Sequence, residues 1–294
     1  MSSPTDGTSG APADPDAARL RAAPEGDPAD PIARARPPAW LAGALVPAAP
    51  DFDERVVRRE SDPAGDPAGG WRAARREGLE VRTFECLAPN GRLRFSGQLR
   101  TADGTDAVGL GELRGAELLV QRGALELGGR HLGPGTYVRL PRGAAEPDPE
   151  ADPAEAADAG PPLLAGGSLV YLSIGQIEPT DRERRVIDTG SPDAWLDGPI
   201  DGIEVLPLHG HRTGNVMLVR WSGPAAFRPK LDPTGEELLV LEGTLHDARG
   251  SYPAGTWIRN PVPAWQSWGG SPGALVCYKS GHFGALADRS APTP

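Results

Sequence analysis

Residues 235–261 read GEELLVLEGTLHDARGSYPAGTWIRNP, and residues 115–141 read GAELLVQRGALELGGRHLGPGTYVRLP. The two stretches align without a gap. An apolar Leu-Leu-Val triplet, several glycines and a final proline fall at the same places in both. Self-similarity of this length, found twice, predicts two copies of one domain rather than a solenoid of short repeats.

Short apolar segments punctuated by Gly, Pro and Asp recur through both copies. They cover residues 81–84, 118–120, 136–139, 169–172, 216–221, 238–241, 256–259 and 274–278. Regular short segments with turn residues between them are typical of strands in a sandwich or barrel. The spacing of apolar residues that marks a helix is absent from both copies. The sequence therefore predicts an all-β protein.

Weaker similarity upstream of each stretch sets the expected domain limits. We expect the first domain to span residues 54–180 and the second to span residues 184–284. Residues 1–53 are rich in Pro, Ala and Asp, and we expect a disordered segment there because few large apolar side chains are available for burial. The acidic stretch 144–163 has no counterpart in the second copy, which predicts a solvated loop or a docking segment for a basic partner. Residues 285–294 are expected to be a flexible tail.

Charge and composition exclude several classes of function. The chain of 294 residues has a formal net charge of −10, and a surface of that sign repels phosphate backbones, so we expect no nucleic-acid partner. No apolar run approaches the ~18 residues of a membrane helix, and no signal peptide is recognisable. Cys86 and Cys277 fall in different copies, which favours reduced thiols. These features, with the Ala-, Gly- and Arg-rich composition, indicate a bacterial, cytoplasmic protein.

The second copy resembles the cupins, and most closely the cupin domain of ChrR-type anti-sigma factors. The resemblance rests on Val219-Arg220-Trp221, on Pro229 and Pro233, and on residues 235–243 and 252–261. With the internal repeat, it implies a bicupin: two double-stranded β-helix (jelly-roll) domains in tandem. The anti-sigma activity itself does not carry over, because residues 1–53 contain no His or Cys for the zinc-binding module that precedes the cupin in those proteins.

The resemblance also implies where metal ligands would stand. Cupins of this kind hold zinc, iron or manganese with a His-x-His-x3-Glu motif and a further His after the Asn-Pro. In this chain Lys230, Asp232, Glu236 and Gln266 occupy those positions, so one ligand is kept. The corresponding positions of the first copy hold Leu110, Glu112 and Ala116.

Lys230 and Asp232 are two residues apart and share one face of a strand, and a short turn would bring Glu236 back towards them. We expect the Lys230 ammonium to take the place of the missing metal charge and to hold both carboxylates, since a buried carboxylate needs a partner. A cation is a poor metal ligand, so no cofactor is expected. The alternatives are a divalent metal held weakly by Asp232, Glu236 and Gln266, an unoccupied solvated rim, and a nucleophilic lysine.

Two further groups of side chains are candidates for the same region. Trp221, Trp257 and Trp268 would line the barrel mouth as an aromatic wall or pack in the core. His209 and His211 would share one face if they lay on a strand, which suits a metal. The glycine between them and the residues that follow predict a turn instead, with the pair exposed or hydrogen-bonded.

Three functions are compatible with these patterns. The first is a small-ligand-binding or regulatory module that uses the second barrel mouth without a metal and is not an enzyme. The second is a metal-dependent cupin dioxygenase or isomerase with a non-standard Asp/Glu/Gln site. The third is a structural protein that forms a homodimer through sheet edges.

Overall fold

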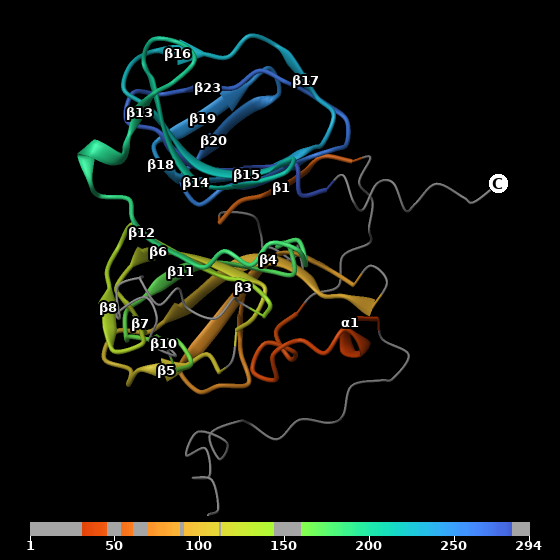
Figure 1. The fold of residues 1–294 in the computed structure, drawn as a ribbon, viewed down its shortest axis with the longest axis vertical. Helices are drawn as coiled ribbons and strands as arrows, with labels where there is room; N and C mark the ends of the chain where they lie inside the picture. Colours follow the sequence, from red (N-terminus) through yellow and green to blue (C-terminus); the bar gives the residue numbers. More distant parts are fainter. Residues whose placement is uncertain are drawn as a thin grey trace, which may run out of the picture.

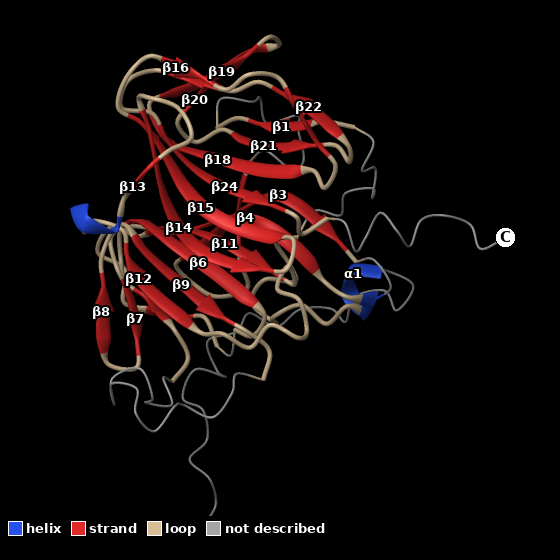
Figure 2. Ribbon diagram, turned by 45° about the horizontal axis from the view of Figure 1, so that its top comes forward, coloured by secondary structure: helices blue, strands red, loops and turns tan. Residues whose placement is uncertain are grey.

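The computed structural model describes residues 31–45, 54–60, 70–88, 91–111, 113–143 and 160–283. Within these ranges nearly all of the regular secondary structure is β-strand, as predicted (Figures 1 and 2). The expected disorder over residues 1–30 and 46–53, most of the acidic stretch, and the expected tail lie outside the described residues. No helix in the described ranges has the length and hydropathy that a membrane crossing requires.

The first barrel pairs a seven-stranded sheet with a four-stranded one. In spatial order the larger sheet contains β12 (Arg185–Asp188), β9 (Thr136–Leu140), β6 (Ala116–Arg122), β11 (Leu169–Ile174), β4 (Arg94–Thr101), β3 (Leu79–Leu87) and β2 (Trp71–Ala73). The smaller sheet contains β5 (Val108–Gly109), β10 (Leu163–Leu164), β7 (Leu125–Leu127) and β8 (Arg130–Leu132). All pairings within them are antiparallel, which is the arrangement of a jelly roll.

The second barrel repeats this arrangement. Its seven-stranded sheet contains β1 (Val56–Arg58), β21 (Trp257–Asn260), β18 (Glu236–Glu242), β24 (Leu275–Ser280), β15 (Gly214–Trp221), β14 (Ile203–His211) and β13 (Leu196–Asp197). Its four-stranded sheet contains β16 (Ala225–Ala226), β23 (Gly269–Gly270), β19 (Thr244–Asp247) and β20 (Gly250–Pro253). A separate ribbon joins β17 (Lys230–Asp232) to β22 (Ala264–Gln266), and the 3-10 helix η3 (Pro192–Ala194) precedes β13.

Turn glycines explain why the repeat is visible in the sequence. Gly135 and Gly255 occupy equivalent turns just before β9 and β21, with φ of 84° and 82°. Glycine adopts this left-handed region without the steric penalty that a Cβ atom brings. The aligned glycines of the two copies therefore mark the same turns.

The two barrels exchange a strand. β1, which precedes the first barrel in the chain, pairs with β21 of the second, and Val57 lies opposite Ile258. β12, which follows the first barrel, pairs with β9 of the first, and Ile187 lies opposite Tyr137. The limits at 54 and 184 remain a proposal, and the structure adds that the first strand after each limit belongs to the sheet of the other barrel.

The outer faces of the two large sheets pack against each other (Figure 1). The cluster between them combines side chains of both barrels: Phe84, Leu119, Tyr137, Tyr171, Leu206, Leu208, Val216, Leu218, Leu239, Trp257 and Cys277. Phe84 stacks on Trp257 with ring centroids 5.5 Å apart. Each large sheet is thus buried on both faces, by its own barrel interior and by the partner sheet.

Part of the N-terminal segment that we expected to be disordered is folded. Residues 31–45 contain the short helix α1 (Pro31–Arg34), and the Trp40 side chain is 2% exposed. The Trp40 indole Nε1 donates to the Leu110 carbonyl oxygen at 2.6 Å, and Leu41 joins the core of the first barrel. The few large apolar residues of a Pro/Ala-rich segment are enough to anchor it when a ready-made barrel supplies the rest of the core.

The end of the acidic stretch also differs from the prediction of a solvated loop. Pro162 is buried, its carbonyl oxygen accepts a hydrogen bond from the Leu110 amide, and Leu163 begins β10. The last residues of the stretch complete the small sheet of the first barrel, because β10 lies between β5 and β7.

Candidate functional site

The second barrel contains a cavity of about 220 Å³. It is lined by Pro199, Val205, Met217, Val219, Trp221, Phe227, Arg228, Lys230, Glu236, Leu238, Trp268, Val276 and Tyr278. Most of these side chains are apolar or aromatic, and the few polar ones stand at two places, near Glu236 and at Arg228 and Lys230. A small apolar cavity with few polar groups is typical of a site for a small molecule.

Strand geometry places Glu236 inside the barrel. Gly235 turns the chain with a φ of 71°, and Glu236 is the first residue of β18. Side chains alternate along a strand, so Glu236 points into the cavity with Leu238, while Glu237 points to the opposite face, towards the first barrel. Both carboxylates are buried, with 0% and 1% exposure.

The Glu236 carboxyl is only partly satisfied. Its Oε1 accepts hydrogen bonds from Asn260 Nδ2 at 2.6 Å and from Trp268 Nε1 at 2.7 Å. Its Oε2 is buried and has no hydrogen-bond partner among the described residues. Burial raises the pKa of Glu236 to about 7, against the lowering effect of Asn260, Trp268 and the Tyr278 hydroxyl, and the charge of Asp232 raises it further. Near neutral pH this carboxyl can thus be present in either protonation state.

The ion pair that we expected between Lys230 and the two carboxylates is not formed among the described residues. Lys230 is exposed at the mouth of the cavity. Asp232 is buried, and its Oδ1 accepts hydrogen bonds from the Thr234 amide at 2.8 Å and the Thr234 hydroxyl at 2.7 Å. The long lysine side chain can keep its ammonium in water, which avoids the cost of burying a charge.

Two of the three predicted tryptophans line the cavity. Trp221 makes an edge contact with Phe227, and Trp268 donates to Glu236, so both belong to the inner wall. Trp257 does not line the cavity and instead packs in a core, which is the other of the two positions that we considered. On β21, Ile258 lies opposite Leu238 and Trp257 lies opposite Leu239, which puts Trp257 on the outer face, where its Nε1 donates to Glu237 at 2.8 Å. Gln266 pairs with Lys230 across the ribbon of β17 and β22.

The first barrel has apolar residues where the second has polar ones. The sequence alignment and the strand registers pair Glu236 with Ala116, Asn260 with Leu140, Tyr278 with Leu172 and Lys230 with Leu110. Ala116, Leu172 and Leu110 are all buried in the core of that barrel. Glu112 lies outside the described residues. The polar side chains Glu236, Asn260 and Tyr278 are therefore a feature of the second barrel.

The donors around Glu236 do not fit the zinc, iron or manganese that cupins of this family hold. The cavity lining contains neither His nor Cys, and Glu236 is its one carboxylate among the described residues. The side chain of Asp232 is engaged by Thr234. No three His, Cys, Asp or Glu side chains in the described ranges are placed to share a metal ion. A stable transition-metal site needs about four N, S or O donors, including nitrogen or sulfur for zinc.

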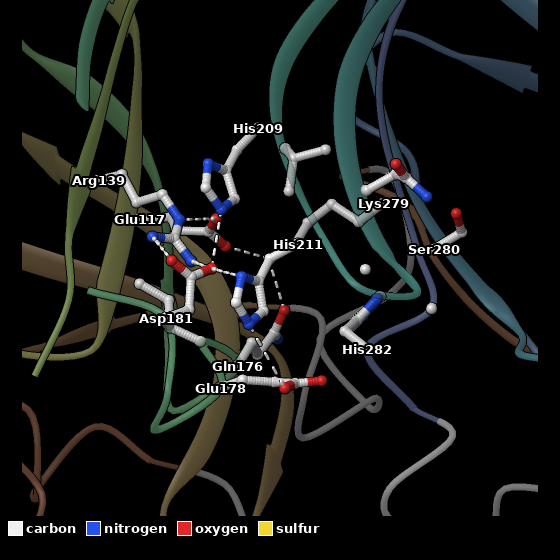
Figure 3. Close-up of a pocket in the computed structure, with 15 residues that line it drawn as sticks. Glu117, Arg139, Gln176, Glu178, Asp181, His209, His211, Lys279, Ser280 and His282 are labelled. Carbon is white, nitrogen blue, oxygen red and sulfur yellow. Dashed lines mark hydrogen bonds and ion pairs between the residues drawn. The ribbon is translucent and has the colours of Figure 1, made fainter. Parts of the chain in front are cut away.

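His209 and His211 lie on β14, not in the turn that we expected, because the hairpin reverses after them at residues 212–213. Both rings point towards Asp181, at the edge of the inter-barrel interface (Figure 3). His209 Nε2 is 2.8 Å from Asp181 Oδ2, and His211 Nδ1 is 3.8 Å from the same atom. Arg139 binds both oxygens of that carboxylate. The guanidinium already supplies the positive charge, so this pair does not fit a metal either.

Next to this pair, a buried charge network joins the barrels. Lys279 Nζ of the second barrel contacts Glu117 Oε2 of the first at 2.6 Å and Gln176 Oε1 at 2.6 Å. Burial would raise the pKa of Glu117, but Lys279 and other donors outweigh it and hold the pKa at about 2. Glu237, the counterpart of Glu117 in the repeat, accepts from Tyr171 across the interface at 2.7 Å. This network was not predicted, although the aligned Glu117 and Glu237 are the trace of it in the sequence.

Comparison with known proteins agrees with this geometry. Residues 182–283 match the family model of the ChrR Cupin-like domain. Among solved structures, protein Ylba from E. coli is 13% identical, covers 80% of this chain and 94% of its own, and has a TM-score of 0.51. A Cupin 2 conserved barrel domain protein from Leptotrichia buccalis is 8% identical, over 69% of this chain and 89% of its own, with a TM-score of 0.46.

The complex of SigE with the anti-sigma ChrR from Rhodobacter sphaeroides also matches, at 20% identity over 29% of this chain and 48% of that chain, with a TM-score of 0.25. No curated protein matches the chain. At these identities the structural likeness establishes the fold alone. Residues 182–283 are a ChrR Cupin-like domain, and this all-β chain is a cupin-fold protein built from two jelly-roll barrels.

Proposed function

We propose that the protein is a small-ligand-binding or regulatory module whose binding site is the cavity of the second barrel. The observation that carries this proposal is the buried Glu236 Oε2 on the wall of an apolar cavity, which has no hydrogen-bond partner within the described ranges. A buried carboxylate oxygen without a hydrogen bond costs about 1–3 kcal/mol, or more when charged. A ligand that supplies a hydrogen bond there would recover that free energy.

The contrast between the two barrels supports the same assignment. The first barrel is filled by an apolar core to which Trp40 and Leu41 of the N-terminal segment contribute. The second keeps a cavity of about 220 Å³. We assign the first barrel a supporting role, in which it covers the outer face of the sheet that carries Glu236.

The alternative of a cupin dioxygenase or isomerase with a metal at Asp232, Glu236 and Gln266 has weaker support. Glu236 faces the cavity, but Asp232 is turned to Thr234. The homodimer that we considered would use sheet edges, and the exposed Leu231 and Trp265 on the ribbon of β17 and β22 are its best candidates. The homodimer does not account for the buried carboxyl in an apolar cavity, and the metal alternative lacks nitrogen or sulfur ligands in the described lining of that cavity.

The test blocks the cavity and leaves the fold intact. Met217 lines the cavity wall and is partly buried, so Met217→Trp would fill the space, and Met217→Leu is the volume-matched control. Phenol and indole are suitable probes, since each combines an aromatic body with one polar hydrogen. We expect saturable binding by isothermal titration calorimetry to the wild type and Met217→Leu, and its loss in Met217→Trp. Near-UV circular dichroism checks that each variant is folded. No saturable binding to the wild type, or equal binding to a folded Met217→Trp protein, would contradict the proposal.

A further inference from the structure

The mouth of the cavity in the second barrel carries two positive charges. Arg228 and Lys230 both line it, and both side chains are exposed. Among the described residues neither forms an ion pair. The nearest acidic residue in the chain, Asp232, is buried and engaged by Thr234. Two uncompensated cations therefore stand at the entrance.

This local charge opposes the charge of the whole molecule. The chain carries a formal net charge of −10, so its surface as a whole repels anions. A pair of cations at the mouth of a cavity makes that one place attractive to an anion. An arginine beside a lysine is well suited to a carboxylate, because the guanidinium fork can bind both carboxylate oxygens.

The part of the cavity between its mouth and Glu236 favours a ligand whose middle portion is apolar. Val205, Val219, Leu238 and Val276 line the walls, and aromatic rings complete them. At the far side Glu236 Oε2 lacks a partner. A ligand that matches the cavity from its mouth to Glu236 has a negatively charged head, a compact apolar middle and a hydrogen-bonding group at the other end.

We infer that the second barrel binds a small organic acid, whose carboxylate lies at Arg228 and Lys230, whose apolar body fills the cavity, and whose far end hydrogen-bonds Glu236. This inference rests on the proposed function and adds the chemical class of the ligand. We expected Lys230 to pair with Glu236 inside the protein. It is exposed instead, and in this inference it binds the carboxylate of the ligand.

The experiment compares three molecules of nearly equal shape. They are 4-hydroxyphenylacetate, its neutral amide and the cationic amine tyramine. Two exposed ion pairs contribute modestly, so we expect the acid to bind about tenfold more tightly than the amide and tyramine to bind most weakly, as measured by calorimetry at pH 7. Raising the NaCl concentration to about 0.5 M should weaken binding of the acid and leave the amide unchanged.

Substitutions at the mouth of the cavity test whether Arg228 and Lys230 cause the preference for the acid over the amide. The double substitution Arg228→Gln and Lys230→Gln should lower the affinity for the acid about tenfold and leave the affinity for the amide unchanged. Arg130→Gln, which removes an exposed positive charge from β8 of the first barrel, is the matched control and should change neither. These side chains are exposed, so the fold should tolerate all three changes.

The outcomes separate this inference from the proposal beneath it. If the amide binds as tightly as the acid, or if the double variant keeps the full preference for the acid, the ligand class is wrong although the cavity still binds. If none of the three molecules binds and phenol and indole also fail, the proposed function itself is wrong. If the variants do not fold, the salt dependence of binding to the wild type still tests whether the ligand must be an anion.

Discussion

Glu236 is the residue on which the proposed function depends, and its chemistry follows from its position. The same residue type one place along, Glu237, has its pKa held well below the usual range, because the donors and cations around it, His282 first, outweigh the effect of burial. For Glu236 the effect of burial outweighs the hydrogen bonds that it accepts, and its pKa rises to about 7. Adjacent glutamates on one strand thus acquire opposite properties, because they face different interiors.

The raised pKa of Glu236 predicts a pH-dependent stability. The folded protein binds this proton more tightly than the unfolded chain, where the pKa is about 4.5. The contribution of Glu236 to stability is therefore fully present below pH 4.5 and is lost as the pH rises to about 7. We expect Glu236→Gln to match the wild type near pH 4 and to exceed it at pH 8 by up to about 3 kcal/mol in the free energy of unfolding.

Urea unfolding at a series of pH values measures this difference. Glu126→Gln changes an exposed residue of β7 and should leave the stability curve nearly unchanged. A constant difference between Glu236→Gln and the wild type from pH 4 to pH 8 would show that the carboxyl is not desolvated in the folded protein.

At the scale of secondary-structure elements, the contact of β24 with β6 and β11 joins the two barrels through buried charges. Lys279 on β24 reaches Glu117 on β6 and Ser173 on β11, and these strands belong to different barrels. A buried ion pair gives little net stability over apolar packing, but removal of one partner leaves the other charge uncompensated. The network therefore contributes more to the relative orientation of the two sheets than to the free energy of their association.

Single and double substitutions separate these two effects. Lys279→Met should destabilise the protein by about 3–5 kcal/mol, and Glu117→Gln added to it should restore part of that loss. The exposed pair Arg220–Glu204 is the control, and Arg220→Met should cost less than about 1 kcal/mol. Because the pKa of Glu117 is about 2, its contribution should persist above pH 4.5 and disappear as the pH falls towards 2. Urea unfolding of the wild type and these three variants gives the values, and a Lys279→Met cost no larger than that of Arg220→Met would rule out a buried network.

At the scale of the whole molecule, the barrels are joined by more than packing. Each large sheet contains a strand from the chain segment of the other barrel, β1 in one case and β12 in the other. Arg55, next to β1, also binds Asp247 of the second barrel and lies over the Tyr252 ring, 5.0 Å from its centroid. Neither barrel can open without breaking main-chain hydrogen bonds of the other.

This connection predicts cooperative unfolding. We expect a single calorimetric transition, with the van't Hoff enthalpy equal to the calorimetric one, although the chain contains two barrels. A fragment of residues 184–283 lacks β1 and exposes the edge of β21, so it should show no native near-UV circular dichroism. Two resolved transitions in the full chain, or a folded monomeric fragment, would mean that the barrels are independent.

Much of the fold can be predicted from local patterns. The repeated glycines mark the turns, the short β-branched and leucine-rich runs become the strands, and the match at 235–261 points to the cupin barrel. Trp221, Trp268 and Glu236 could be assigned to the barrel interior from the same resemblance. These features are local because turn conformation and strand preference depend on residues close in sequence.

The repeat, the strand content and the position of Glu236 can therefore be predicted from local patterns alone. Four features depend on the tertiary structure: Trp257 faces the partner barrel, Lys230 is exposed, Trp40 is buried, and two strands are exchanged. The physical reason is that both faces of each large sheet are covered. The first residues of β18 are all buried, so the alternation that normally identifies the inner face is absent from the sequence.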